Sequence, residues 1–141
     1  MARASGERAD RRTPSPQPLR VLFVEDNPAD VSLLVAELRR SGFEPRFQRV
    51  ETEEQYLAAL DPALDLILAD YAVPNFGAER ALALLRATDL DIPFIVVSGT
   101  VGEEIAASLI RDGATDYLLK DRLTRLGQAI RHARERQKLL Q

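Results

Sequence analysis

The sequence predicts a doubly wound α/β fold, in which a five-stranded parallel sheet in the order 2-1-3-4-5 carries helices on both faces. Short, continuous apolar runs, typical of strands buried on both faces, alternate with segments whose apolar residues recur at helical spacing. The loops between them are short. Five such strand–helix pairs, joined by right-handed connections, make this flavodoxin-like strand order the natural arrangement.

The length and composition suit one globular domain. The chain has 141 residues, of which 45% are hydrophobic and 29% charged, and a chain of this size buries a full core without disulfides or structural metals. It contains no cysteine and a single histidine, His132. This excludes disulfides, thiol catalysis and thiolate metal sites, and leaves little for a Ser/His/Asp triad. Any chemistry must therefore use carboxylates, hydroxyls, amines and backbone groups.

Charge is unevenly distributed along the chain. The first 20 residues carry five arginines against Glu7 and Asp10, whereas the remaining 121 residues hold 14 basic and 20 acidic side chains. This acidic body argues against nucleic acid as a partner.

No apolar run approaches the roughly 20 residues of a membrane span, and no apolar segment opens the chain as in a secretory signal. We therefore expect a cytoplasmic protein. Residues 1–18, rich in Arg, Ser, Pro and Ala, are predicted to be a disordered basic tail before a folded domain over residues 19–141.

The first strand is expected over residues 21–24, whose apolar residues are continuous. Asn27 followed by Pro28 is typical of an N-cap and a first helical turn, and the helix that begins there is expected to stop at Ser41-Gly42. The next strand, over residues 46–50, is more polar. That composition suits the edge of the sheet.

Thr52 and Gln55 have the spacing of a capping box, which predicts that a second helix begins here and runs to about Leu60. The third strand is expected over residues 64–69. A loop then leads to a helix that passes through Leu82.

A fourth strand is expected over residues 93–97, followed by a helix around Leu109 that ends at Asp112-Gly113. The fifth strand is expected over residues 115–119, and a last helix runs from about residue 121 to residue 139.

Functional groups are expected at one edge of this sheet, because ligands of such folds bind beyond the carboxyl ends of the strands, near the reversal of strand order. Four strands end on polar or charged residues: Glu25 and Asp26 after the first, Asp70 after the third, Ser98 after the fourth and Lys120 after the fifth. Clustered carboxylates repel one another unless a cation lies between them, and oxygen ligands alone suit Mg²⁺. Lys120 can balance a carboxylate or pair with a phosphoryl group, and Ser98 can donate to an oxyanion.

Four short motifs carry a resemblance to a known family. They are Val-Glu-Asp-Asn at 24–27, Asp-Tyr-Ala-Val-Pro at 70–74, Val-Ser-Gly-Thr at 97–100 and Asp-Tyr-Leu-Leu-Lys at 116–120. In this order and at these spacings the chain resembles the receiver domain of two-component response regulators, over residues 20 to about 138.

The resemblance implies a role for each residue of the site. Asp70 would accept a phosphoryl group from a phosphohistidine on a sensor histidine kinase or a phosphotransfer protein. Mg²⁺, with Mn²⁺ as an alternative, would be held by Glu25, Asp26, Asp70 and the backbone carbonyl of Ala72. Ser98 and Lys120 would contact the phosphoryl oxygens, and Tyr117 would swing inward when Ser98 is drawn to the phosphate. Such a protein is a phosphoacceptor that assists its own phosphorylation and dephosphorylation rather than an enzyme.

The sequence departs from the family pattern in two places that matter. Lys120 is followed by Asp121, where the family usually has proline. Ala72 and Thr100 stand two positions after the phosphoacceptor and after Ser98, where residues can orient the attacking water. Ala72 has no group that does so, and slow self-dephosphorylation is therefore expected.

Three other functions use this fold or the same kinds of residue. A phosphohydrolase with an aspartate nucleophile needs a general acid, typically an aspartate two residues further on, and that position is Ala72. A flavin-binding domain of this fold would have a phosphate loop after the first strand, whereas residues 25–28 are anionic. A pseudo-receiver, which binds partners without being phosphorylated, stays open as the alternative.

The last helix carries a heptad-like pattern. Its apolar or semi-polar positions are spaced 3-4-3-4-3, at Leu123, Leu126, Ile130, Ala133, Gln137 and Leu140. The first half of this stripe is expected to pack on the sheet. Beyond Ala133 the helix is expected to extend past the sheet, as a homodimer contact or the start of a signalling linker.

Overall fold

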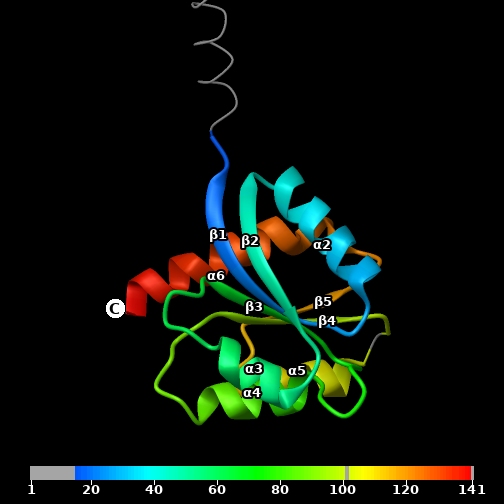
Figure 1. Cartoon of the computed structure of the whole chain (residues 1–141). Helices are drawn as coiled ribbons and strands as arrows, with labels where there is room; N and C mark the ends of the chain where they lie inside the picture. Colours follow the sequence, from blue (N-terminus) through cyan, green and yellow to red (C-terminus); the bar gives the residue numbers. More distant parts are fainter. Residues whose placement is uncertain (1–14, 101, 141) are drawn as a thin grey trace, which may run out of the picture.

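A computed structural model describes residues 15–100 and 102–140 of the chain. The sheet is parallel, in the predicted order β2-β1-β3-β4-β5 (Figure 1). Its strands are β1 (Gln17–Val24), β2 (Phe43–Val50), β3 (Leu66–Asp70), β4 (Phe94–Ser98) and β5 (Asp116–Leu119). The helices in the described ranges are α2 (Pro28–Arg40), α3 (Glu53–Ala59), α4 (Ala78–Arg86), α5 (Glu103–Arg111) and α6 (Leu126–Leu140), with a 3₁₀ turn, η1 (Leu123–Arg125), before α6.

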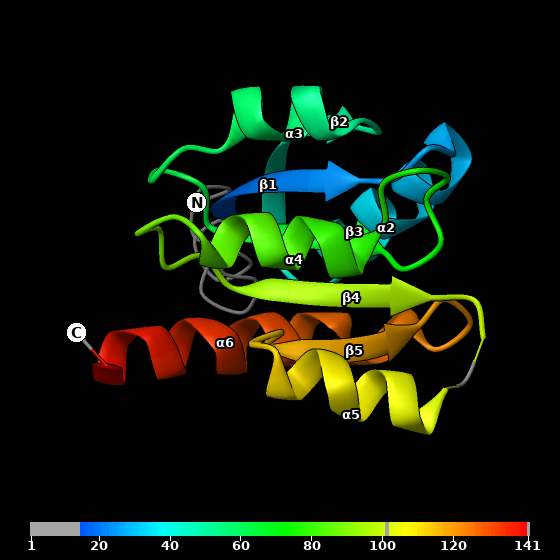
Figure 2. The same cartoon turned by 90° about the horizontal axis from the view of Figure 1, so that it is seen from below.

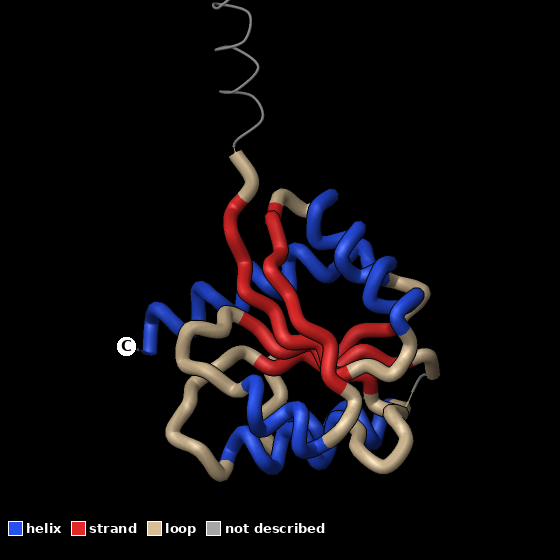
Figure 3. Tube along the Cα trace, viewed as in Figure 1, coloured by secondary structure: helices blue, strands red, loops and turns tan. Residues whose placement is uncertain are grey.

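The helices form two layers around the sheet (Figures 1 and 3). Helices α2 and α6 cover one face, and α3, α4 and α5 cover the other. Successive residues of β1 point to opposite faces, so Phe23 packs in the core beneath α2 and α6, and Leu22 packs in the core beneath α3 to α5. Both are fully buried. Burial on both faces explains why the strands are continuous apolar runs rather than alternating ones.

The predicted signals at the helix ends are confirmed. Asn27 caps α2, accepting a hydrogen bond from the Ala29 N–H at 2.9 Å, and Gly42, with a φ of 96°, follows its last turn. Thr52 caps α3 through its hydroxyl, which accepts from the Gln55 N–H at 3.1 Å. The Gln55 side chain returns to the N–H of Glu51, one residue before the cap.

Several predicted boundaries were wrong. Strand β2 begins at Phe43 rather than at residue 46, and β3 begins at Leu66 rather than at residue 64. Strand β1 begins at Gln17, within the stretch predicted to be a tail, because it pairs with β2 from Gln17 opposite Phe43 onward; residues 1–14 of that stretch lie outside the described residues. The last helix begins at Leu126 rather than near residue 121. A turn closed by the Arg122 N–H on the Leu119 carbonyl, at 3.0 Å, comes first.

The parallel strands place all their carboxyl ends at one edge of the sheet. In Figure 2 the strand arrows point to this edge, and the C-terminal end of α6 lies at the opposite one. Within residues 15–100 and 102–140, no helix has both the length and the apolar character that crossing a bilayer requires.

Candidate functional site

Three carboxylates lie together at the carboxyl edge of the sheet. Glu25 and Asp26 follow β1 and Asp70 ends β3, and pairing of Val24 with Ala69 brings the two strand ends level. Each residue offers an oxygen within 4.8 Å of the others. Glu25 and Asp70 are buried, whereas Asp26 is exposed. The group therefore opens to solvent on the side of Asp26.

Burial and mutual repulsion disfavour the ionised forms of these carboxylates. Desolvation, together with the charge of Asp70, raises the pKa of Glu25 to about 7, although the Asn27 N–H and Lys120 act in the opposite direction. A cation between the carboxylates would relieve this penalty. The donors are all carboxylate oxygens, so the residues present fit a hard divalent cation such as Mg²⁺ or Mn²⁺.

Lys120 directly follows β5 and reaches the carboxylates past the end of β4, which lies between β5 and β3. Its Nζ donates to Glu25 Oε1 at 3.1 Å, to Asp70 Oδ2 at 3.2 Å and to Asp30 Oδ2 at 2.7 Å. Burial lowers the pKa of Lys120, but the hydrogen bonds to Asp30 and Glu25 and the charge of Asp70 outweigh burial and raise that pKa above its ordinary value. The ammonium group is therefore fully charged at neutral pH.

Asp30 was missed in the sequence analysis. It lies in the first turn of α2, and a signal for it was present: the Asn27 cap places that turn directly after the β1 carboxylates. Arg49 was missed as well. Its guanidinium donates to the backbone carbonyl of Glu25 at 3.3 Å, and this brings the edge strand β2 into contact with the site.

Ser98 ends β4, the strand next to the one that Asp70 ends, and Tyr117 lies one strand further on, in β5; both side chains are hydrogen-bonded to the loop after β4. The Ser98 hydroxyl donates to the Thr100 carbonyl at 3.1 Å and accepts from the Thr100 N–H at 3.3 Å. The Tyr117 hydroxyl donates to the same carbonyl at 3.1 Å. The Tyr117 ring is half-buried and packs against the core beneath α3 to α5.

The loop after Asp70 presents its backbone to the site. The Ala72 N–H donates to Asp70 Oδ1 at 3.3 Å, and the Ala72 side chain is exposed. Gly77 allows this loop to close, because a Cβ there would collide with the Tyr71 carbonyl oxygen. The Tyr71 hydroxyl in turn donates to Glu79 at 2.7 Å.

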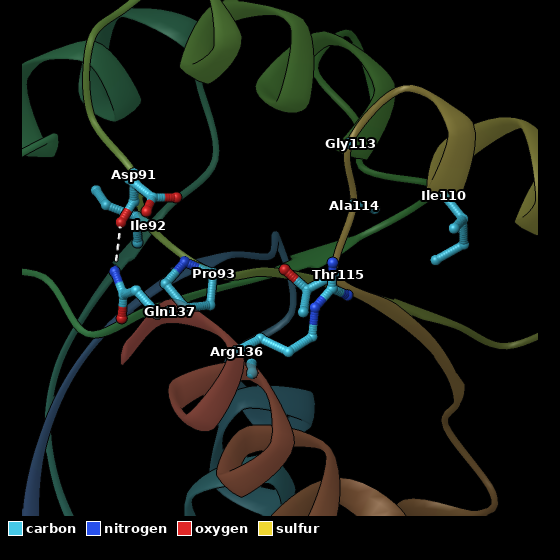
Figure 4. Close-up of a pocket in the computed structure, with 10 residues that line it drawn as sticks. Asp91, Ile92, Pro93, Ile110, Gly113, Ala114, Thr115, Arg136 and Gln137 are labelled. Atoms are coloured by element: carbon cyan, nitrogen blue, oxygen red, sulfur yellow. Dashed lines mark hydrogen bonds between the residues drawn. The ribbon is translucent and has the colours of Figure 1, made fainter. Parts of the chain in front are cut away.

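A cavity of about 260 Å³ lies far from this group, between α6 and the amino ends of β4 and β5 (Figure 4). Gln137 lines it and donates to the Asp91 carbonyl at 2.6 Å. This contact also shows that α6 still touches the domain at Gln137, although the helix was expected to extend past the sheet beyond Ala133. The carboxylates that could hold a cation are at the other end of the sheet.

The fold and site together define a doubly wound α/β domain of the receiver type. The sequence model of the response regulator receiver domain matches residues 21–131. The chain belongs to this family, whose members are signalling modules of two-component systems.

Relatives and solved structures agree with this assignment. The transcriptional regulatory protein PrrA of Mycobacterium bovis is 33% identical over 101 residues, which cover 72% of this chain and 43% of PrrA. The Mn²⁺-bound response regulator Rcp1 is 25% identical with a TM-score of 0.65, covering 82% of this chain and 91% of Rcp1. The receiver domain of the histidine kinase CKI1 from Arabidopsis thaliana, complexed with Mg²⁺ and BeF₃⁻, is 24% identical with a TM-score of 0.66, covering 83% and 90%. The chain spans less than half the length of the curated relatives it matches.

Proposed function

We propose that Asp70 is a phosphoacceptor that takes a phosphoryl group from a phosphohistidine on a sensor histidine kinase or a phosphotransfer protein. The observation that carries this proposal is the contact between Lys120 and Asp70, at 3.2 Å, within the group of three carboxylates. A carboxylate is a weak nucleophile towards phosphorus until it is positioned and the charge of the transferred group is neutralised. Family membership supports the same function.

The chain's own groups account for the transfer. One Asp70 oxygen forms a bond to phosphorus as the phosphorus–nitrogen bond to the donor imidazole breaks, and the electron pair returns to that imidazole. The Ala72 N–H holds one Asp70 oxygen, and Lys120 holds the other. Glu25, Asp26, Asp70 and the carbonyl of Ala72 are proposed to hold Mg²⁺. When bound, the ion would neutralise charge on the phosphoryl oxygens.

The signal is proposed to pass through Ser98 and Tyr117. A phosphoryl group on Asp70 presents new anionic oxygens, towards which the Ser98 hydroxyl rotates, leaving the Thr100 carbonyl. Tyr117, which donates to the same carbonyl, then changes its position. Such a change at the surface alters which partner the domain binds.

We infer that the partners are a kinase or phosphotransfer protein in the cytoplasm and, through the end of α6, a second copy of the chain. Leu139, near the end of α6, has 80% of its surface exposed. Leu139 lies beside the heptad-like positions rather than among them, and an apolar side chain this exposed at the end of a helix supports a contact with a second apolar surface.

Intact mass after incubation with Mg²⁺ and a small acyl phosphate tests the proposal. We expect one phosphoryl adduct, which is lost in Asp70→Asn and in the metal-free protein. A phosphorylated histidine phosphotransfer domain, used as a second donor, tests transfer from nitrogen. If neither donor gives an adduct, although calorimetry detects Mg²⁺ binding, the pseudo-receiver alternative is favoured.

A further inference from the structure

Lys120 uses all three of its ammonium hydrogens at the site. A lysine ammonium group has three donors and no acceptor, and its partners here are Glu25, Asp70 and Asp30. The contact to Asp30, at 2.7 Å, is the shortest of the three. A charge-assisted bond of this length is a strong one.

Asp30 differs from the other two partners in what else it touches. Glu25 and Asp70 belong to the group of carboxylates that could hold a cation, and Asp30 does not. Lys120 therefore shares Glu25 and Asp70 with the proposed metal and phosphoryl groups. Its bond to Asp30 is to a carboxylate outside that group.

The surroundings fix Asp30 in place. Its backbone N–H donates to the carbonyl of the cap residue Asn27 at 3.1 Å, and the next turn of α2 is anchored by the buried Leu34. A small, mostly apolar hollow beside the pair includes Leu34 and Leu123. The side chains of Asp30 and Lys120 are only 28% and 26% exposed, so solvent screens their attraction less than at an open surface.

We propose that Asp30 is a positioning residue, whose carboxylate holds the Lys120 ammonium group over Asp70 so that one N–H stays directed at the phosphoryl group. This role rests on the proposed function of Asp70. Asp30, in the first turn of α2, would thus assist phosphorylation through Lys120 and would not itself contact the reacting atoms.

The test compares Asp30→Asn, which keeps the side-chain shape and removes the charge, with Glu103→Gln as a matched control. Glu103 is also an acidic residue in a first helical turn, that of α5, and is exposed. With a small acyl phosphate at saturating Mg²⁺, we expect Asp30→Asn to lower the maximal phosphorylation rate about tenfold. The Mg²⁺ affinity should change by less than about threefold, because Asp30 is not a member of the metal group. Glu103→Gln should match the wild type.

A second readout does not require phosphorylation. The Lys120 ammonium group, held by three carboxylates, should give a slowly exchanging ¹H–¹⁵N signal in the wild type and in Glu103→Gln, and this signal should broaden or vanish in Asp30→Asn. Equal rates in wild type and Asp30→Asn overturn the proposal, even with an altered ammonium signal, and so does a fixed ammonium signal in Asp30→Asn. If the wild type takes no phosphoryl group, the proposed function fails and this role fails with it. The ammonium signal then reports only whether Asp30 binds Lys120.

Discussion

The hydroxyl groups of Ser98 and Tyr117 donate to one acceptor, the backbone carbonyl of Thr100, each over 3.1 Å. The two side chains come from neighbouring strands, β4 and β5. A carbonyl oxygen has two lone pairs, and each hydroxyl uses one. The two bonds do not compete, so Ser98 and Tyr117 are linked through the position of Thr100 itself: a rotation of Ser98 would free this residue to move together with Tyr117.

This shared acceptor predicts that Ser98→Ala uncouples Tyr117 from the phosphoacceptor. With Mg²⁺ and beryllium fluoride, a phosphoryl mimic, the Tyr117 ring signals in NMR spectra should shift in the wild type. In Ser98→Ala they should shift by less than half as much, because the side chain that links the two groups is missing. Ser32→Ala, an exposed serine on α2, is the control. Equal shifts in both variants would contradict the coupling.

Ala72 is predicted to keep the phosphorylated state long-lived. Its side chain is exposed two residues after Asp70 and has no group to orient a water molecule. Ala72→Asn or Ala72→Asp should shorten the half-life of the phosphorylated protein about three- to tenfold, less than the roughly hundredfold or more of full general acid–base catalysis, because the new side chain only orients the attacking water. Loss of the adduct over time, followed by intact mass, measures this.

The control for that series is Ala63→Asn, at an exposed alanine before β3, which should leave the half-life unchanged. An unchanged half-life in both Ala72 variants would show that the residue at this position does not limit hydrolysis.

Glu25 is predicted to lower the stability of the metal-free protein at high pH. Its pKa in the folded state, about 7, lies above its ordinary value of 4.5. Between these values the folded state keeps a proton that the unfolded state has released, so stability falls as pH rises through this window. Glu25→Gln should therefore raise the free energy of unfolding by about 1–3 kcal/mol at pH 8 and by almost nothing at pH 5.

Urea denaturation of the metal-free protein at both pH values measures this difference. Glu54→Gln, at an exposed position on α3, controls for the loss of one negative charge. Mg²⁺ should raise the melting temperature of the wild type more than that of Glu25→Gln. If Glu25→Gln is less stable than the wild type at pH 8, Glu25 is not strained in the folded state.

The sequence was sufficient to predict the sheet because its strands are buried on both faces. Runs such as residues 21–24 are apolar throughout, which is typical of strands covered on both faces, and the caps at Asn27 and Thr52 define where helices begin. The ends of strands were less predictable where pairing with a neighbouring strand extends a strand into polar sequence. The polar start of β1 at Gln17 is stabilised by backbone bonds to β2. The local sequence around Gln17 does not predict this pairing.

The residues at the strand ends could be predicted, but not which groups they contact. Lys120 was expected to balance one carboxylate and contacts three, because the first turn of α2 brings Asp30 beside the end of β5. Likewise, a hydroxyl at Ser98 was predictable, whereas its bond to Thr100 depends on how the loop after β4 folds back. These are contacts between elements distant in sequence, and no periodicity encodes them.

Leu139 is predicted to contribute to self-association. Sedimentation over a range of concentrations should show a dimer for the wild type and a weaker one for Leu139→Glu, because a charge replaces an apolar side chain that is 80% exposed. Leu33→Glu on α2, at a residue that is 62% exposed, is the matched control. A point substitution is preferable to removing residues 134–141, because Gln137 contacts the Asp91 carbonyl. A wild type that is monomeric at all concentrations would contradict the prediction.

Gly127 is predicted to be required for the packing of α6 against the end of α2. In an exposed helix, Gly→Ala stabilises by about 1 kcal/mol, because alanine loses less backbone entropy on folding. Gly127 is buried, and a Cβ there would lie 2.6 Å from Cβ and Oγ of Ser41, closer than real contacts allow. Gly127→Ala should therefore lower the free energy of unfolding by about 1–3 kcal/mol, the usual range for overpacking.

A double-mutant cycle separates this contact from helix propensity. Ser41→Gly removes both atoms that the new methyl group would meet, so Gly127→Ala in that background should recover most of the lost stability. Gln128→Ala, at the exposed neighbouring position on α6, should change the free energy of unfolding by less than about 0.5 kcal/mol. Two results would contradict this packing: a Gly127→Ala variant as stable as the wild type, or the same loss in the free energy of unfolding in the wild-type and Ser41→Gly backgrounds. Either would mean that the two helices do not meet as closely as described. Hydrogen bonding from Arg131 to the Ser41 carbonyl, at 3.2 Å, predicts that they do, since this bond spans the same junction one turn further along α6.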